Sequence, residues 1–231
     1  MGEKTIGILG GMGPEATADL FHRIIRATPA KRDQDHFHVI IDSNAKIPDR
    51  TPAILGTGPN PFSIILETGK NLESAGADFL IMPCNTAHYF YEQLQEQLKV
   101  PLIHMIRTSA EYVVNNYPEL KNSGLIATDG TIASQLYNTA YLEKGVKIST
   151  PTEKSQNEVM EAIYNHIKSG NLKKGKKIVK RVAQELVTAG SSAVICGCTE
   201  ISLVLHKGDL TVPIIDPLQI LAEKAVELAS A

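Results

Sequence analysis

Two cysteines occupy matching positions in two stretches of this chain that resemble each other. The first stretch reads Gly76-Ala-Asp-Phe-Leu-Ile-Met-Pro-Cys84-Asn-Thr, and the second reads Gly190-Ser-Ser-Ala-Val-Ile-Cys-Gly-Cys198-Thr-Glu. In each stretch an apolar run typical of a buried strand ends at the cysteine, and small polar residues follow. One thiol from each half of a repeat indicates a site with two thiols, which suits proton transfer on two faces of one carbon.

The predicted surroundings of these cysteines favour reactive thiols over side chains that only fill the core. Cys84 and Cys198 each fall where a strand turns into a helix, so free backbone N–H groups and the helix dipole should lower the thiol pKa. The alternative is that a buried cysteine is only a small apolar side chain. Two cysteines at equivalent repeat positions make that alternative the weaker one. Cys196 lies inside the apolar run without metal-ligand spacing around it, and we expect it to pack in the core.

The elements that must position the two thiols alternate along the chain. Apolar runs predict extended segments at 5–9, 38–41, 77–82, 101–105, 125–127, 146–149 and 193–196. Helices are expected at 14–27, 61–75, 88–98, 133–142, 157–168, 176–189 and 217–229. Regular alternation of this kind predicts an α/β protein with mostly parallel sheets flanked by helices.

The repeat extends beyond the cysteines. The run that begins at Gly7 resembles the run that begins at Gly124, which indicates duplication of an α/β unit and hence two pseudo-symmetric lobes. The chain is expected to cross between the lobes twice. Residues 1–103 plus 214–231 would form lobe one, and residues 104–213 would form lobe two. The default place for an active site is the cleft between such lobes.

Composition excludes several classes of protein. The chain has 231 residues, 43% of them hydrophobic, and a net charge of −2, which gives no reason to expect nucleic acid or an anionic membrane as partner. No apolar run approaches the ~20 residues of a membrane span, and the apolar part of the N-terminus is too short for a signal peptide. Three cysteines, an odd number, do not make a disulfide framework. A reducing cytoplasm is therefore the expected location.

Other motifs leave alternatives open. The run Gly11-Met-Gly13-Pro-Glu-Ala16, with Asp42 ending the next strand, weakly matches a dinucleotide fingerprint and keeps a dinucleotide-binding oxidoreductase as the alternative from another class. A non-catalytic small-molecule binding protein is a third interpretation. Arg50, in a proline-flanked loop, and Lys168, after a helix, are either solvated cations or anchors for a carboxylate. The seven histidines show no metal spacing, and we expect most of them at the surface or as caps.

Five motifs together resemble those of the aspartate/glutamate racemase superfamily, in its aspartate racemase branch. They lie at 8–17, 47–52, 82–88, 127–132 and 197–201, so that the resemblance spans nearly the whole chain. It implies two pseudo-symmetric α/β lobes, a cleft with two catalytic cysteines, no cofactor, an amino acid as the small-molecule substrate, and a homodimer. The implied reaction is the interconversion of L- and D-aspartate, and the alternative is a broad-specificity or glutamate-accepting racemase of the same superfamily.

The resemblance also implies roles for individual residues. Cys84 and Cys198 would be the two catalytic bases. Arg50 and Lys168 match positions that bind the side-chain carboxylate in aspartate-specific members. The other residues implied to bind or surround the substrate are Met12, Asn85, Thr86, Thr131, Thr199 and Glu200. At Glu200 and at the Gly10-Gly11 pair the chain departs from the glutamate racemases of cell-wall synthesis, which argues against that branch.

Overall fold

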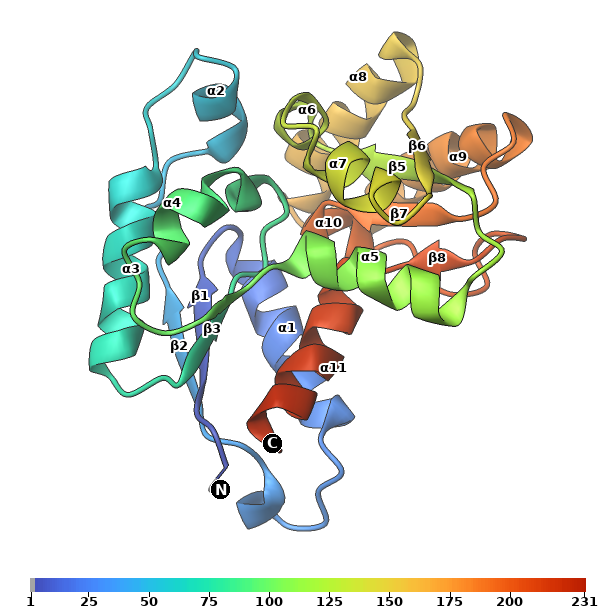
Figure 1. Cartoon of the computed structure of the whole chain (residues 1–231). Helices are drawn as coiled ribbons and strands as arrows, with labels where there is room; N and C mark the ends of the chain where they lie inside the picture. The colour runs from blue at the N-terminus through green and yellow to red at the C-terminus, as the bar shows by residue number, and fades with distance from the viewer. Residues whose placement is uncertain (1–2) are drawn as a thin grey trace. The chain divides into compact units, whose positions relative to one another are not determined.

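A computed structural model describes residues 3–231 of the chain (Figure 1). The chain divides into two compact units, one holding the N-terminal part through Thr108 together with Leu218–Ala231, and the other holding Ser109–Pro217. Both divisions fall a few residues after the boundaries predicted from the sequence. The reason is that a continuous helix, α5 (Met105–Asn116) or α11 (Pro217–Ala229), runs through each boundary.

Unit 1 is built around a four-stranded parallel sheet with the strand order β2-β1-β3-β4. Its strands are β1 (Ile6–Gly10), β2 (Val39–Ser43), β3 (Phe79–Ile81) and β4 (Leu102–Ile103). In the register, Ile8 of β1 stands beside Ile81 of β3. All five residues of β1 are buried, as expected for a central strand that is covered on both faces.

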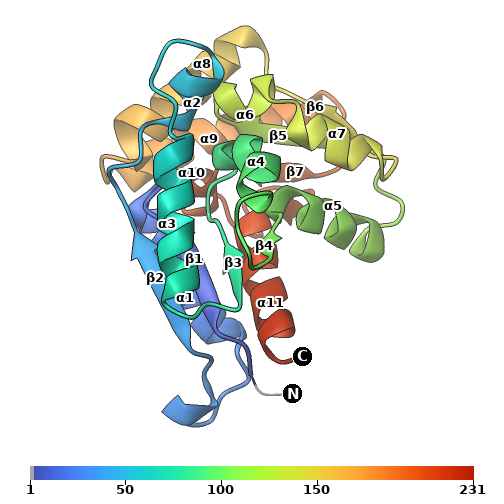
Figure 2. The same ribbon diagram turned by 60° about the vertical axis from the view of Figure 1, so that its left-hand side comes forward.

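Helices cover both faces of this sheet, as Figures 1 and 2 show. On one face, Ile8 packs in a cluster with Leu20 and Leu221, which come from α1 (Pro14–Ala27) and α11. On the other face, Leu9 packs in a cluster that includes α3 (Phe62–Ser74) and α4 (Tyr91–Gln95). Neighbouring residues of β1 therefore serve opposite faces, which is the period of two that a strand requires. The shorter helices are α2 (Arg50–Ile54) and two 3-10 helices, Asp33–Asp35 and Thr86–Phe90.

Unit 2 repeats this topology with a four-stranded parallel sheet in the order β6-β5-β7-β8. Its strands are β5 (Asn122–Ala127), β6 (Lys147–Ser149), β7 (Val194–Gly197) and β8 (Ile214–Ile215). Its helices are α6 (Asp129–Ala133), α7 (Leu136–Leu142), α8 (Glu153–Glu161), the π-helix Ala162–Ile167, α9 (Leu172–Thr188) and α10 (Thr199–Ser202). Each unit thus runs its four strands in the same spatial order, and the predicted fold of two similar α/β units is confirmed.

The sequence predicted some helices better than others. Helix α1 begins at Pro14, where the fixed φ of proline suits the first turn. Gly76 and Gly190 follow the helices before β3 and β7, and both have a positive φ that ends those helices at equivalent points of the repeat. By contrast, the predicted helix 133–142 is two helices, because Gln135 takes a left-handed conformation between them. The predicted extended segment 101–105 ends at Ile103, and α5, which follows it, was not foreseen.

Two further predicted helices take other forms. The segment 88–98 is a 3-10 helix followed by the short α4, and the predicted helix 157–168 starts earlier, at Glu153, and widens into a π-helix at its end. Across residues 3–231, no helix combines the length and the apolar character that crossing a membrane requires.

Candidate functional site

Both cysteines lie at the carboxyl edges of the two sheets. Cys84 comes shortly after β3, and Cys198 directly follows β7. In each unit the strand order reverses between the first strand, β1 or β5, and the third, β3 or β7. Connections leave such a point in opposite directions, so a crevice forms there at the carboxyl ends of the strands, and open α/β sheets bind their ligands in it. Each unit therefore presents its thiol at the place where its own topology favours a ligand.

In unit 1 the loop after β1 joins Met12 and Arg50 to the surroundings of Cys84. Met12 and Cys84 are buried in the same apolar cluster. The buried Arg50 donates hydrogen bonds from Nη2 to the Met12 carbonyl at 3.2 Å and from Nη1 to the Pro48 carbonyl at 3.1 Å. The structure thus brings three of the residues predicted from the sequence to one edge of the sheet. The guanidinium of Arg50 is fixed there by backbone carbonyls of two loops.

The glycine-rich turn after β1 has a packing explanation. Gly11 has a φ of +91°, and a Cβ on it would collide with the backbone of Asn44. Its N–H donates to the Thr17 hydroxyl at 2.9 Å. Glycine is therefore required because the loop after β2 passes directly against this backbone. The weak dinucleotide fingerprint is accounted for without a nucleotide.

Asn85 and Thr86 follow Cys84 directly and are both buried. Thr86 begins the 3-10 helix Thr86–Phe90, so the chain turns tightly as soon as it has passed the cysteine. Backbone and side chain of these two residues thus stay at the same edge as the thiol.

His88 is a residue of this edge that the sequence analysis did not single out. It is 1% exposed, although we expected most histidines at the surface or as caps. Its Nδ1 lies 2.8 Å from the carbonyl oxygen of Cys84, and its Nε2 lies 3.1 Å from the backbone nitrogen of Met105. Burial lowers the pKa of His88 to about 4, which keeps the ring neutral. The available signal was its place four residues after a cysteine.

In unit 2 a carboxylate and an ammonium group line up with the thiol of Cys198. The Cys198 Sγ donates to Glu200 Oε2 at 2.8 Å, and Lys168 Nζ lies 4.0 Å from the other oxygen, Glu200 Oε1. The Thr199 hydroxyl lies 3.5 Å from Glu200 Oε2. Four of the residues predicted from the sequence are therefore brought together within one unit, and Glu200 is the one that joins them.

A widened turn of helix positions Lys168. The N–H of Lys168 donates to the carbonyl of Ile163 at 3.1 Å, five residues back, where the π-helix Ala162–Ile167 ends. Such turns are frequent at functional sites. The Lys168 ammonium lies 4.2 Å from the centre of the Tyr164 ring, a cation–π contact that the sequence analysis did not foresee. Tyr164 and Glu200 together fix where the positive charge of Lys168 lies.

The ionisation expected for Cys198 is not what the structure shows. Burial raises the pKa of the Cys198 thiol well above its ordinary value, and the Glu200 carboxylate raises it further, while Lys168 acts in the opposite direction. The expectation of a favoured thiolate was therefore wrong for this cysteine. The helix that follows it, α10, is only four residues long, and so short a dipole does not offset the desolvation of a buried thiolate. Cys198 stands as a thiol whose proton points at a carboxylate.

Two further residues discussed in the sequence analysis, Thr131 and Cys196, also lie in unit 2. Thr131 is buried in α6, just after β5, and its N–H and hydroxyl both bond to the Thr128 hydroxyl, at 3.2 and 3.1 Å. It thus follows β5, the strand that neighbours β7, and lies at the same edge as Cys198. Cys196 is fully buried in β7 within the apolar cluster under α8 and α9. Within residues 3–231, no three His, Cys, Asp or Glu side chains gather in a way that could hold a metal ion.

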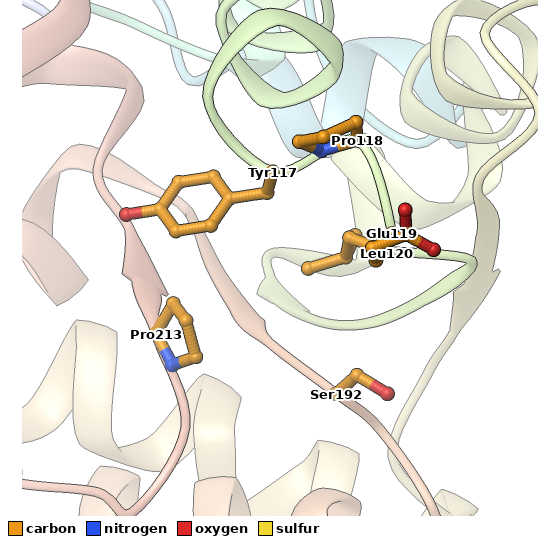
Figure 3. A pocket seen from close by; sticks show the side chains of 6 residues that line it. All are labelled: Tyr117, Pro118, Glu119, Leu120, Ser192 and Pro213. Atoms are coloured by element: carbon orange, nitrogen blue, oxygen red, sulfur yellow. The ribbon is translucent and has the colours of Figure 1, made fainter.

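A hollow of about 310 Å³ lies elsewhere in unit 2, and Figure 3 shows the side chains that line it. It is lined by Tyr117, Pro118, Glu119, Leu120, Ser192 and Pro213. These residues precede β5, β7 and β8, so the hollow lies at the amino edge of the sheet, opposite to Cys198. It does not belong to the candidate site.

Comparison with known proteins agrees with this geometry. A family model described as Asp/Glu/Hydantoin racemase matches residues 9–225. The chain is 27% identical, over 96% of both chains, to the broad specificity amino-acid racemase RacX of Bacillus subtilis. An aspartate racemase from Picrophilus torridus shares 28% identity at a TM-score of 0.89, covering 98% of this chain and 94% of its own.

An aspartate racemase homologue from Pyrococcus horikoshii shares 29% identity at a TM-score of 0.79, covering 99% of this chain and all of its own. These matches run through both units and through both cysteine motifs. The chain therefore belongs to the Asp/Glu/Hydantoin racemase family and is an amino-acid racemase, an isomerase.

Proposed function

We propose that the protein interconverts L- and D-aspartate without a cofactor and uses Cys84 and Cys198 as its two bases. The observation that carries this proposal is the repeated placement of the thiols. Each is buried at the carboxyl edge of a sheet, where the strand order reverses. Two copies of one architecture supply two equivalent thiols, and racemisation is a reaction that uses two. The proposal requires both sulfurs to reach one substrate carbon.

Racemisation removes a proton from one face of Cα and returns a proton to the other face. In the proposed mechanism one cysteine enters as thiolate and takes the α-proton, while the other enters as thiol and donates its own proton. The two cysteines leave with their protonation states exchanged, and the substrate gains and loses one proton. Negative charge develops on the α-carboxylate in between, and we assign Asn85, Thr86 and Thr199 to hold that carboxylate with hydrogen bonds.

Glu200 receives a more specific role than the resemblance implied. Its carboxylate accepts the hydrogen bond of the Cys198 thiol, so it is the group placed to take the thiol proton when Cys198 must enter as thiolate. The positive charge of Lys168, on the far side of Glu200, favours the thiolate form of Cys198. In this mechanism Lys168 opposes the effect of burial on the thiol pKa, while the Glu200 carboxylate accepts the thiol proton.

Selection of aspartate is assigned to Arg50 and Lys168. A buried guanidinium with its planar set of N–H donors suits a carboxylate, and a substrate without a distal carboxylate leaves that charge poorly solvated. From the sequence alone, Arg50 and Lys168 are equal candidates for this role. Lys168 already lies beside Glu200, so most of the discrimination falls to Arg50.

A second candidate is a racemase of broad specificity. The similarity to RacX over 96% of both chains favours it, and so does the partner that Lys168 already has in Glu200. The two candidates differ in one measurable ratio, the kcat/KM for aspartate relative to that for alanine. Preference for aspartate by a factor on the order of ten or more is expected, about the free energy of one charge-assisted hydrogen bond.

The test is racemisation of both enantiomers of aspartate, glutamate and alanine in D₂O, after dialysis against EDTA and without added cofactor. Inversion accompanied by deuterium incorporation at Cα is expected, with aspartate the best substrate. Activity that appears only with added pyridoxal phosphate or a metal ion would overturn the two-thiol mechanism. Faster racemisation of alanine than of aspartate would establish the broad-specificity candidate instead.

A further inference from the structure

The hydrogen bonds of His88 select one tautomer of its ring. The Cys84 carbonyl can only accept and the Met105 N–H can only donate, so the proton resides on Nδ1 and Nε2 is bare. A protonated ring would place a second N–H against the N–H of Met105. The first turn of α5 therefore holds this imidazole neutral, in agreement with its low pKa.

The groups around His88 reinforce this state. The ring of His104 lies 4.9 Å from it, and the ring of Tyr91 is parallel to that of His88 and tilted against that of His104. His104 Nδ1 accepts a hydrogen bond from the N–H of Arg107 at 3.3 Å, so two imidazoles accept from the first turn of α5. The Arg107 guanidinium lies over Tyr91 and pairs with the exposed Glu92. Burial and the positive charge of Arg107 lower the pKa of His88, and they outweigh the carbonyls of Cys84 and Ile103, which raise it.

The backbone of Cys84 is thereby held on both sides. Its N–H donates to the carbonyl of Met82 at 2.8 Å, and its carbonyl accepts from His88 at 2.8 Å. In unit 2 the carbonyl of Cys198 instead accepts from the N–H of Ile201 at 2.9 Å, a backbone bond of the first helical turn that spans three residues. Unit 1 thus uses a side chain for a function that backbone performs in unit 2. With both peptide groups fixed, rotation about the Cα–Cβ bond is the main freedom left to the Cys84 thiol.

We propose that His88 is a positioning residue for Cys84, which ties the peptide of that cysteine to the first turn of α5 and so sets the direction of its thiol. The inference rests on the proposed function only in taking Cys84 as one of the two bases. His88 itself takes no proton from the substrate. Its contribution is geometric and depends on the Nδ1–H that reaches the Cys84 carbonyl.

Two substitutions each keep one of the two hydrogen bonds of His88 and remove the other. In His88→Asn the side-chain NH₂ replaces Nδ1–H and keeps a donor for the Cys84 carbonyl. In His88→Gln the amide oxygen replaces Nε2 and keeps an acceptor for Met105. If His88 positions Cys84, then His88→Gln lowers kcat for aspartate about tenfold with little change in KM, while His88→Asn stays within about threefold of wild type. Equal losses of kcat in both variants would indicate a merely structural role and overturn the proposal.

A matched control is His104→Asn, which removes the neighbouring buried ring but leaves a side chain that can cap α5. It should racemise aspartate like wild type. In the Cys84→Ser background, replacing His88 with Gln should leave the remaining α-proton exchange unchanged, because that exchange uses Cys198. A further loss there would show that His88 does not act through Cys84.

A second readout needs no racemase activity. In a chain with Cys196→Ser and Cys198→Ser, Cys84 is the sole thiol, and its alkylation by iodoacetamide can be followed directly. His88→Gln should raise the alkylation rate several-fold, since a loosened thiol is more accessible, and His88→Asn should not. Identical rates in the two variants would refute the positioning role. Failure of racemisation in wild type, together with the expected alkylation difference, would refute the proposed function but not this inference.

Discussion

The turns that carry Cys84 and Cys198 have the same place in the same topology, yet they hold their cysteines by different means. At Cys198 the contact is made to the thiol itself, by the carboxylate of Glu200. At Cys84 it is made to the backbone, by the imidazole of His88. One turn controls the proton of its thiol, and the other controls the direction in which its thiol points.

One link is common to both turns. The residue four positions after each cysteine, His88 or Ser202, bonds to the segment that directly follows the fourth strand. His88 accepts from the N–H of Met105, and Ser202 donates to Asp216 Oδ1 at 2.7 Å. The duplicated fold therefore kept a connection between the cysteine turn and the end of β4 or β8. The two copies use different side chains for that connection. We therefore attribute the connection itself to the fold, and the choice of side chain to the half-reaction of each cysteine.

Removal of either sulfur should cause the largest loss of racemase activity. Cys84→Ser and Cys198→Ser should each lower racemisation by 10²–10⁴-fold or more, about the size of one general acid–base contribution. Each variant should still exchange the α-proton of one enantiomer in D₂O, and the two variants should favour opposite enantiomers. Cys196→Ser is the control and should retain most activity. Full activity in either of the first two variants would show that the turns are not equivalent in function.

The buried histidine in the turn that carries Cys84 should make the free energy of unfolding depend on pH. Because His88 has a pKa of about 4 when folded and 6.5 when unfolded, protons bind first to the unfolded chain. The contribution of His88 is therefore complete above pH 6.5 and is lost as the pH falls toward 4, by about 3 kcal/mol at most. His104, also depressed by burial, adds in the same direction. Urea denaturation at several pH values should show a shallower acid decline in His88→Asn than in wild type.

Replacement of Glu200, which accepts the hydrogen bond of the Cys198 thiol, should have a smaller effect on activity and tests a single contact. Glu200→Gln keeps the shape of the side chain but removes its charge, so the pKa of Cys198 should fall and its thiolate should appear at lower pH. Racemisation should drop by a factor of about 10–100, because the thiol loses its proton acceptor. Ultraviolet absorbance of the thiolate, in a chain with Cys84 and Cys196 replaced by Ser, reports the pKa shift. An unchanged titration would mean that Glu200 does not control this thiol.

The smallest expected effect concerns the two cations. Arg50→Ala should lower kcat/KM for aspartate about tenfold more than for alanine, because the buried guanidinium, which the Met12 and Pro48 carbonyls hold in place, has planar N–H donors that suit a carboxylate. Lys168→Ala should discriminate less between the two substrates, since Lys168 also serves Glu200. Competition assays with both amino acids in one mixture measure these ratios directly. Equal losses for both substrates in Arg50→Ala would remove Arg50 from substrate selection.

Local patterns were enough to predict much of this protein. The apolar runs that end at Cys84 and Cys198 predicted strands followed by turns, Pro14 predicted the start of α1, and the repeat predicted two similar α/β units. These features depend on side-chain period, on the fixed φ of proline and on the freedom of glycine, which act within a few residues of the chain. The resemblance of five motifs to one superfamily then indicated an amino-acid racemase, and the comparison with known proteins confirmed that family and that class of reaction.

Only the tertiary structure decided what surrounds each thiol. Met105 reaches His88 because β4 pairs in parallel with β3 and ends at the same edge, and Lys168 reaches Glu200 because a π-helix turns its side chain there. The raised pKa of Cys198 likewise follows from burial, which no local pattern measures. Such contacts join residues far apart in the sequence. They depend on strand register and on the exclusion of water, so the sequence alone determined where the two cysteines stand but not what holds them.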